Sequence, residues 1–146
     1  MNKQTPNKQT PNDQTADTAL NPSNDRQHKR SPCPVACTLD ILGDKWTLLV
    51  IRDLFLGKST YSEFQGSPEK MPTNILAERL KRLERAEILV REQYQQRPVR
   101  YAYRLTDKGR ALGPILAAMG KWANRYVPDT WVVDASTSPP TVITKP

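Results

Sequence analysis

The order of elements between residues 60 and 106 constrains the fold of this chain more than any other feature. The residue pattern predicts a short helix, a turn and a second helix, followed by two strands over 88–94 and 99–105. A helix-turn-helix followed by a two-stranded wing is a shape that fits double-stranded DNA. The segment therefore predicts a mainly α fold with a small β-hairpin, organised as a winged helix-turn-helix domain.

Positive charge is concentrated in the same region. From Arg79 to Arg110 the chain has 10 basic and 4 acidic residues, a net charge of +6, while the whole chain carries +7. Charge localised in this way is expected of a surface that binds phosphates. The expected partner is double-stranded DNA.

Composition divides the chain into one folded unit and two tails. Residues 1–32 are polar and open with a degenerate repeat of Asn-Lys-Gln-Thr-Pro, so we expect them to be disordered. Residues 128–146 are rich in Pro, Ser and Thr and should form a flexible tail, which leaves one domain over 33–127. With no signal peptide, no membrane-spanning stretch and only two cysteines, the sequence predicts a cytoplasmic protein without a membrane partner.

Two helices are expected before the helix-turn-helix. The first covers 38–42 and stops at Gly43, and the second covers 45–56 with Asp44 as its N-cap. Because the second is apolar nearly all round, it should be the buried centre of the domain.

The helix-turn-helix carries its own start signals. Thr60 and Glu63 have the spacing of a capping box, so a short helix should begin at Thr60. Thr73 is the expected N-cap of the next helix, the recognition helix. Leucines recur at i, i+4 and i+7 from Leu76 along that helix, which indicates its core face.

After the hairpin, Thr106 should cap one long final helix that Pro114 kinks about two turns in. The helices of the winged body already supply enough leucine to fill its core, so the apolar stripe of the final helix should pair with a second copy about a two-fold axis. The first helix should join this contact. The expected dimer interface consists of Leu39, Leu112, Ile115, Leu116, Met119, Trp122 and Tyr126.

Several blocks of sequence follow one another through this unit: Cys33–Val35, Leu39–Val50, Tyr61–Phe64, Asn74–Leu83 and Tyr103–Gly109. Together and in this order they resemble the HxlR-type winged helix-turn-helix transcriptional regulators. The resemblance implies a homodimer that binds an inverted-repeat operator and controls nearby genes, usually as a repressor and sometimes as an activator.

One residue departs from the family pattern. Glu87 stands where the family usually has glycine, which would leave the recognition helix through a left-handed turn at no steric cost. Glutamate there implies either a strained turn or a different exit from the helix.

The N-terminal residues of a recognition helix reach base edges first. Asn74 can bond adenine, Ala77 can contact a thymine methyl group, and Glu78 can accept from a cytosine amine. Arg79 matches an arginine of the family motif and can reach phosphate or guanine. The DNA-binding candidates, including backbone and wing contacts, are Thr60, Tyr61, Thr73, Asn74, Ala77, Glu78, Arg79, Lys81, Arg82, Arg97 and Arg100. The same charges also fit a solvated helix face with a Glu78–Arg82 salt bridge.

The two cysteines are candidates for a redox or electrophile sensor. Cys33 occupies the position of a cysteine that some family members use in this way, and Cys37 follows four residues later. The plain alternative is that both are small, partly buried apolar residues. We expect no metal site, because the single histidine, His28, lies in the tail, and no cofactor. Nothing in the sequence identifies a small-molecule or electrophile effector.

The sequence predicts a DNA-binding regulator rather than an enzyme. It offers no nucleophile–histidine pair, no glycine loop that cradles phosphates and no paired carboxylates. Two other functions stay open. One is a winged helix that binds an acidic protein partner, and the other is a DNA-binding protein without sequence preference.

Overall fold

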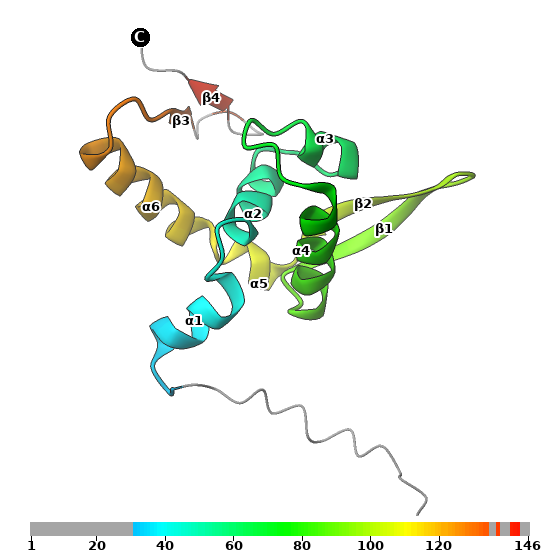
Figure 1. Cartoon of the computed structure of the whole chain (residues 1–146), viewed down its shortest axis with the longest axis horizontal. Helices are drawn as coiled ribbons and strands as arrows, with labels where there is room; N and C mark the ends of the chain where they lie inside the picture. The colour runs from blue at the N-terminus through cyan, green and yellow to red at the C-terminus, as the bar shows by residue number, and fades with distance from the viewer. Residues whose placement is uncertain (1–30, 135–136, 138–140, 144–146) are drawn as a thin grey trace, which may run out of the picture. The chain divides into compact units, whose positions relative to one another are not determined.

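Six helices, a long β-hairpin and a second pair of short strands make up the described part of the chain, residues 31–134, 137 and 141–143 of this computed structural model (Figure 1). The mainly α fold with a β-hairpin is confirmed. The elements in chain order are α1 (Pro34–Leu42), α2 (Thr47–Phe55), α3 (Tyr61–Gln65), α4 (Thr73–Arg85), β1 (Leu89–Gln96), β2 (Val99–Leu105), α5 (Asp107–Arg110), α6 (Gly113–Tyr126), β3 (Val132–Asp134) and β4 (Thr141–Ile143).

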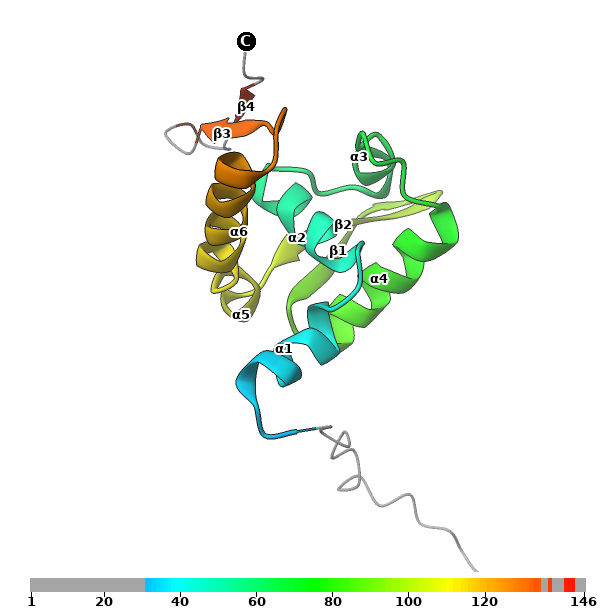
Figure 2. The same ribbon diagram turned by 60° about the vertical axis from the view of Figure 1, so that its left-hand side comes forward.

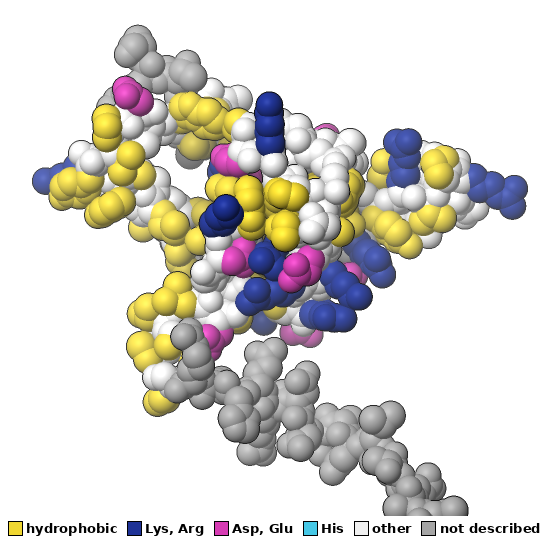
Figure 3. All heavy atoms as spheres, in the orientation of Figure 1, with side chains coloured by type: hydrophobic (Ala, Val, Ile, Leu, Met, Phe, Trp, Pro, Cys, Tyr) yellow, Lys and Arg dark blue, Asp and Glu magenta, His cyan; other side chains and the backbone are white. Residues whose placement is uncertain are grey.

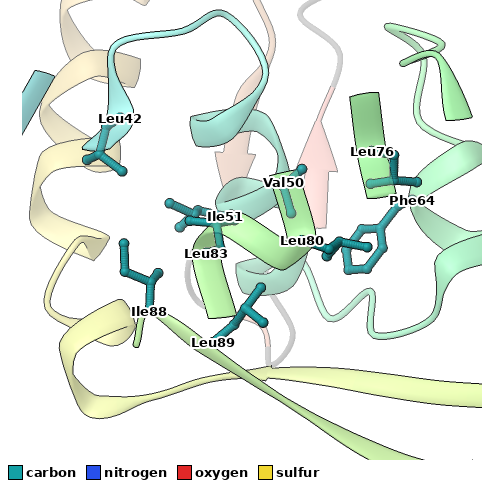
Figure 4. Close-up of a cluster of buried hydrophobic side chains, with 9 residues drawn as sticks. All are labelled: Leu42, Val50, Ile51, Phe64, Leu76, Leu80, Leu83, Ile88 and Leu89. Carbon is teal, nitrogen blue, oxygen red and sulfur yellow. The ribbon is translucent and has the colours of Figure 1, made fainter. Parts of the chain in front are cut away.

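Helix α2 lies between α4 on one side and α6 on the other (Figure 2). Its Val50 and Ile51 are buried, but Trp46, Leu49 and Leu54 are only half-buried, so the prediction of a helix buried nearly all round is too strong. The hydrophobic core joins residues of five elements and the turn after α4 (Figure 4): Leu42, Val50, Ile51, Phe64, Leu76, Leu80, Leu83, Ile88 and Leu89. The predicted core face of α4 is confirmed.

The starts of three helices are shifted from the prediction. Helix α2 begins at Thr47 rather than residue 45, and Trp46 rather than Asp44 occupies its N-cap position. Helix α1 begins at Pro34 rather than residue 38, since proline suits the first helical position. Helix α4 begins at Thr73 itself, because Pro72 holds the chain extended up to that point and takes the N-cap position. The capping box at Thr60 is confirmed, with the Glu63 carboxylate accepting from the Thr60 N–H at 2.8 Å.

The prediction of one long, kinked helix after the hairpin is wrong. The chain forms the short α5, breaks at Ala111 and Leu112, and resumes as α6 with Pro114 in its first turn, where the missing N–H is no loss. The cap at Thr106 is confirmed, because its hydroxyl accepts from the Gly109 N–H at 3.1 Å. Gly109 is required here, since a Cβ at this position would collide with the Ile88 carbonyl oxygen.

The hairpin is antiparallel, with register from Leu89 opposite Leu105 to Gln96 opposite Val99. Its turn is therefore two residues, shorter than expected, because β1 extends to Gln96. The segment before α3 attaches to this hairpin: the Ser59 carbonyl accepts from the Tyr103 N–H at 2.7 Å. The wing and the first helix of the helix-turn-helix thus hold each other in place.

The C-terminal region contains structure that the tail prediction did not include. Strands β3 and β4 pair antiparallel, with Val132 opposite Ile143. The Thr130 hydroxyl donates to Asn124 of α6 at 2.8 Å, which ties this region to the last helix. Residues 1–30 of the predicted disordered tail lie outside the described residues. Within the described part of the chain, no helix combines the length and the apolar character needed to cross a membrane.

Candidate nucleic-acid interface

Helix α4 presents a polar outer face opposite its buried leucines. Asn74, Ala77 and Glu78, close to its N-terminus, are exposed, and Lys81 and Arg85 continue the same surface. In Figure 3, Lys and Arg side chains gather around α4 and near the end of the hairpin. The face is therefore free to enter a groove with its N-terminal residues first.

Arg79 does not belong to this outer face. Only 13% of its side chain is exposed, and its Nε donates to Asp44 Oδ1, just before α2, at 2.9 Å. Its Nη1 donates to the neighbouring Glu78 at 2.8 Å. The prediction that Arg79 reaches phosphate or guanine is not supported by this placement, since the guanidinium holds α4 against the start of α2.

Arg82 is also turned toward the body of the domain. Its Nη2 donates to the Asp40 carbonyl oxygen of α1 at 2.5 Å, and its Nη1 lies 3.7 Å from Asp44 Oδ2. The expected Glu78–Arg82 salt bridge is absent from the ion pairs of the described residues, because each partner is engaged elsewhere. Arg82 remains partly exposed, at 41% of its side chain.

The Asp44 carboxylate accepts hydrogen bonds both from α4 and from the turn that leads into α2. Partial burial alone would raise the pKa of this carboxyl group. Hydrogen bonds from the Thr47 hydroxyl, the Trp46 N–H, the Arg79 guanidinium and the Thr47 N–H together outweigh burial and lower the pKa from 3.8 to about 2. Asp44 is consequently ionised at any physiological pH.

A second charged cluster holds the turn of the helix-turn-helix. Asp53, buried near the end of α2, accepts from Arg52 at 2.7 Å, from Lys58 at 3.2 Å and from the Ser67 hydroxyl in the α3–α4 turn. Arg52 also pairs with Glu69 of that turn at 2.5 Å, and this hydrogen bond lowers the pKa of Glu69. Both ends of α2 therefore hold parts of the helix-turn-helix. The sequence signal that could have revealed this cluster is an aspartate within an apolar helix.

The start of α3 lies against the start of α4. The Tyr61 hydroxyl donates to the Thr73 carbonyl oxygen at 2.6 Å, and Thr60 is engaged in the capping box. A hollow of about 380 Å³ opens between α3 and the hairpin, bordered by Tyr61, Arg100 and Tyr101 among others. Tyr61 is thus brought to Thr73 at the exposed start of α4, and the contact of these residues with DNA stays a prediction.

The arginines of the hairpin fall into two groups. Arg104 pairs with Glu92, and Arg91 lies 4.8 Å from the ring centre of Tyr101. Arg97 and Arg100 flank the hairpin end and are exposed. The two arginines assigned to the wing contact are therefore the ones at its end.

The recognition helix ends in a left-handed turn at Glu87, whose φ is 58°. The Ile88 N–H donates to the Leu83 carbonyl oxygen at 3.0 Å, as in the usual glycine-terminated helix end. The turn is thus left-handed without a glycine, and glutamate bears a strain of about 1–2 kcal/mol that glycine would avoid.

A broad apolar surface is exposed on α1 and α6, visible in yellow at the left of Figure 3. Trp122 and Tyr126 are 62% and 60% exposed and contact each other, with ring centres 5.6 Å apart. Leu39, Ile115 and Met119 are exposed as well. The two remaining predicted interface residues, Leu112 and Leu116, pack partly against the core of their own chain.

Both cysteines lie at the start of α1. Cys33 occupies the N-cap position and is exposed, whereas Cys37 is half-buried and its thiol donates to the Ser31 carbonyl oxygen at 3.3 Å. Among the residues that the structure describes, no three or more His, Cys, Asp or Glu side chains gather in a way that could hold a metal ion.

Comparison with known proteins agrees with this geometry. The model of the HxlR-like helix-turn-helix family matches residues 41–130. YvaP of Bacillus subtilis strain 168, an uncharacterized HTH-type transcriptional regulator, is 38% identical over 89 residues, which are 61% of this chain and 82% of YvaP. The crystal structure of PA1607, described as a candidate transcription factor, is similar with a TM-score of 0.62 and 43% identity, covering 70% of this chain and 72% of PA1607. The oxidized form of the redox regulator HypR is similar with a TM-score of 0.59 and 35% identity, covering 64% of this chain and 96% of HypR.

Proposed function

Since this chain belongs to the HxlR-like helix-turn-helix family of DNA-binding transcriptional regulators, we propose that it binds an inverted-repeat operator as a homodimer and represses nearby genes. The observation that carries this proposal is the exposed N-terminal face of α4, with Asn74, Ala77 and Glu78 beside a basic surface. A regulator of this kind must reach the chromosome, so we also propose that the protein is located in the cytoplasm.

The residues divide into those that read bases and those that hold the DNA backbone. Asn74, Ala77 and Glu78 enter the major groove, where an asparagine can bond adenine bidentately. Backbone contacts are assigned to Lys81, the start of α3 and the wing. Arg97 and Arg100 suit the adjacent minor groove, and these contacts fix position without reading sequence.

The apolar face of α1 and α6 is proposed to bind the same face of a second copy. A single chain would otherwise leave Trp122, Tyr126, Met119 and Leu39 in water. Exposed apolar patches of this kind mark interaction sites, and aromatic residues are enriched at interfaces. A two-fold dimer presents two copies of α4, which fits two half-sites about one helical turn of DNA apart.

A thiol response is proposed at Cys33. HypR is a redox regulator, and Cys33 is exposed at the start of α1, where an oxidant or electrophile can reach it. Because α1 also carries Leu39 of the proposed interface, a modified Cys33 would act close to the contact between the two copies.

Fluorescence anisotropy tests this function with the full chain, its own upstream DNA and a scrambled duplex of equal length, at several salt concentrations. We expect a preference of ~10³-fold or more for the upstream DNA, which an oxidant abolishes and a reductant restores. Equal, salt-sensitive binding to both duplexes would indicate a nonspecific DNA-binding protein. No binding at low salt would favour a protein partner instead.

A further inference from the structure

Two arginines of α4 that the sequence assigns to DNA converge instead on one carboxylate before α2. We propose that Asp44 is a positioning residue, which sets the direction of the recognition helix and thereby its choice of DNA sequence. The proposal rests on the DNA-binding function proposed above and assigns the control of its specificity.

The Asp44 carboxylate performs two tasks at once. Its Oδ1 accepts from the N–H groups of Trp46 and Thr47 at 2.9 and 3.0 Å, which holds the turn that leads into α2, and from Arg79 Nε at 2.9 Å. Its Oδ2 accepts from the Thr47 hydroxyl and faces Arg82 Nη1 at 3.7 Å. One carboxylate thus bonds both α4 and the start of α2, so it fixes the orientation of α4 relative to α2.

The apolar contacts of α4 with the domain body restrict its direction less, and the hydrogen bond from the Tyr61 hydroxyl to the Thr73 carbonyl oxygen holds only its first residue. Leu76, Leu80 and Leu83 bury apolar surface, and that attraction is not directional. A hydrogen bond between a guanidinium and a carboxylate is directional as well as stronger than a neutral one. Only 13% of the Arg79 side chain and 22% of the Asp44 side chain are exposed, so water competes little for this pair.

A second contact connects α4 to α1 close to Asp44. Arg82 lies one turn of helix after Arg79 and donates to the Asp40 carbonyl oxygen near the end of α1. Successive turns of α4 are therefore held by residues 40–44, which are the end of α1 and the start of its link to α2. Since α1 also carries part of the exposed apolar face, this segment relates the direction of α4 to the surface that binds a second copy.

Loss of the pair should affect specific binding far more than nonspecific binding. Asn74, Ala77 and Glu78 precede Arg79 by less than two turns, so a rotation or shift of α4 moves them away from base edges. Lys81, Arg97 and Arg100 are exposed and still reach phosphates after such a shift, because the phosphate contacts need less exact geometry.

The test is a double-mutant cycle with Asp44→Asn and Arg79→Gln. An asparagine side-chain oxygen accepts from backbone N–H groups as well as aspartate does, so Asp44→Asn keeps the bonds to the N–H groups of Trp46 and Thr47 while it removes the charge that faces the arginines. Binding is measured by anisotropy with a duplex that the wild type selects from a randomised pool, and with a scrambled duplex. Each single variant should lower the preference for the selected duplex at least ~10-fold, with binding to the scrambled duplex changed less than ~2-fold, and the double variant should be no worse than either.

Asp107→Asn is the matched control. It removes a charge from the ion pair between the exposed side chains of Arg110 and Asp107, and it should leave the preference unchanged. A merely structural role for Asp44 would weaken binding to both duplexes alike, which would overturn the proposal. An equal loss from Arg79→Gln in the wild-type and Asp44→Asn backgrounds would also overturn it, because Arg79 would then contact DNA itself. A wild type that selects no sequence would instead refute the proposed function.

Discussion

Helices α4 and α6 have nearly the same length, 13 and 14 residues, and each carries an apolar stripe, yet they use it in different ways. The stripe of α4 is buried within its own chain through Leu76, Leu80 and Leu83, whereas α6 has no buried residue. The winged body is therefore complete in one chain, whereas α6 leaves an apolar face exposed, the face proposed to bind a second copy.

The largest effect is expected from the buried side of this comparison. Leu76→Ala should lower the free energy of unfolding by about 2–5 kcal/mol, since the side chain is fully buried and its loss leaves a cavity. Urea denaturation measures the change. Met119→Ala in α6, tested in a Trp122→Ala background and at a protein concentration low enough to keep the chains apart, should cost less than about 1 kcal/mol. Equal losses of unfolding free energy for Leu76→Ala and Met119→Ala would contradict the view that only α4 is buried within its own chain.

A substitution on the exposed stripe of α6 should weaken the association of two chains rather than the fold of one. Trp122→Ala should weaken self-association by about 2 kcal/mol or more, roughly 30-fold, because exposed aromatic residues at the centre of an interface dominate its energy. Sedimentation equilibrium measures the dissociation constant. Val99→Ala on the hairpin removes a similarly exposed apolar side chain and should leave association unchanged. A dissociation constant that Trp122→Ala leaves unchanged would place the interface elsewhere.

The outer face of α4, opposite its buried leucines, is expected to determine which DNA sequence the protein prefers. Asn74→Ala should cost roughly 1–3 kcal/mol on the preferred duplex and little on a scrambled one, because it removes a base contact. Arg97→Ala, the matched wing variant, should weaken binding to both duplexes alike and reduce the salt dependence. An equal loss on all duplexes for Asn74→Ala would mean that α4 does not read the bases through this residue.

The attachment of α4 to α2 should depend on pH. The pKa of Asp44 is lowered from 3.8 to about 2 in the folded chain, so its contribution to stability is complete above pH 3.8 and is lost as the pH falls toward 2. This contribution is at most about 2 kcal/mol. Urea denaturation of the wild type and of Asp44→Asn should show a stability difference that shrinks across this range. A difference independent of pH would contradict the lowered pKa.

The smallest effect is expected at the end of α4. Glu87→Gly should stabilise the fold by about 0.5–1 kcal/mol, since glycine adopts the left-handed conformation without the steric cost that glutamate pays. Lys81→Gly, in the exposed interior of the same helix, should destabilise by about 1 kcal/mol. Thermal or urea unfolding separates the two variants, and a destabilised Glu87→Gly would show that this turn is not strained.

Local sequence signals predicted most of the fold because each involves residues a few positions apart. The leucines from Leu76, the capping box at Thr60 and the cap at Thr106 all lie within one helix or its start. The surplus of apolar residues after Thr106 also indicated the exposed surface of α6 correctly. The break at Ala111 and Leu112 was missed, since neither residue type ends a helix and Pro114 suggested a kink instead.

The candidate site was less accessible to sequence reasoning. The surface as a whole was predicted from charge, but the directions of Arg79 and Arg82 were not. Arg79 meets Asp44, which is 35 residues away, and periodicity within α4 carries no information about that partner. The buried Asp53 and its contact with Ser67 depend on tertiary structure in the same way.

The central claim is that the apolar face of α6 joins two chains on one DNA site. Sedimentation equilibrium of the full chain with a single selected duplex tests it most directly, because the mass of the complex gives the number of chains. The account predicts two chains per duplex for the wild type and weaker, stepwise binding of single chains for Trp122→Ala. A wild-type complex that saturates with one chain at full affinity would contradict it.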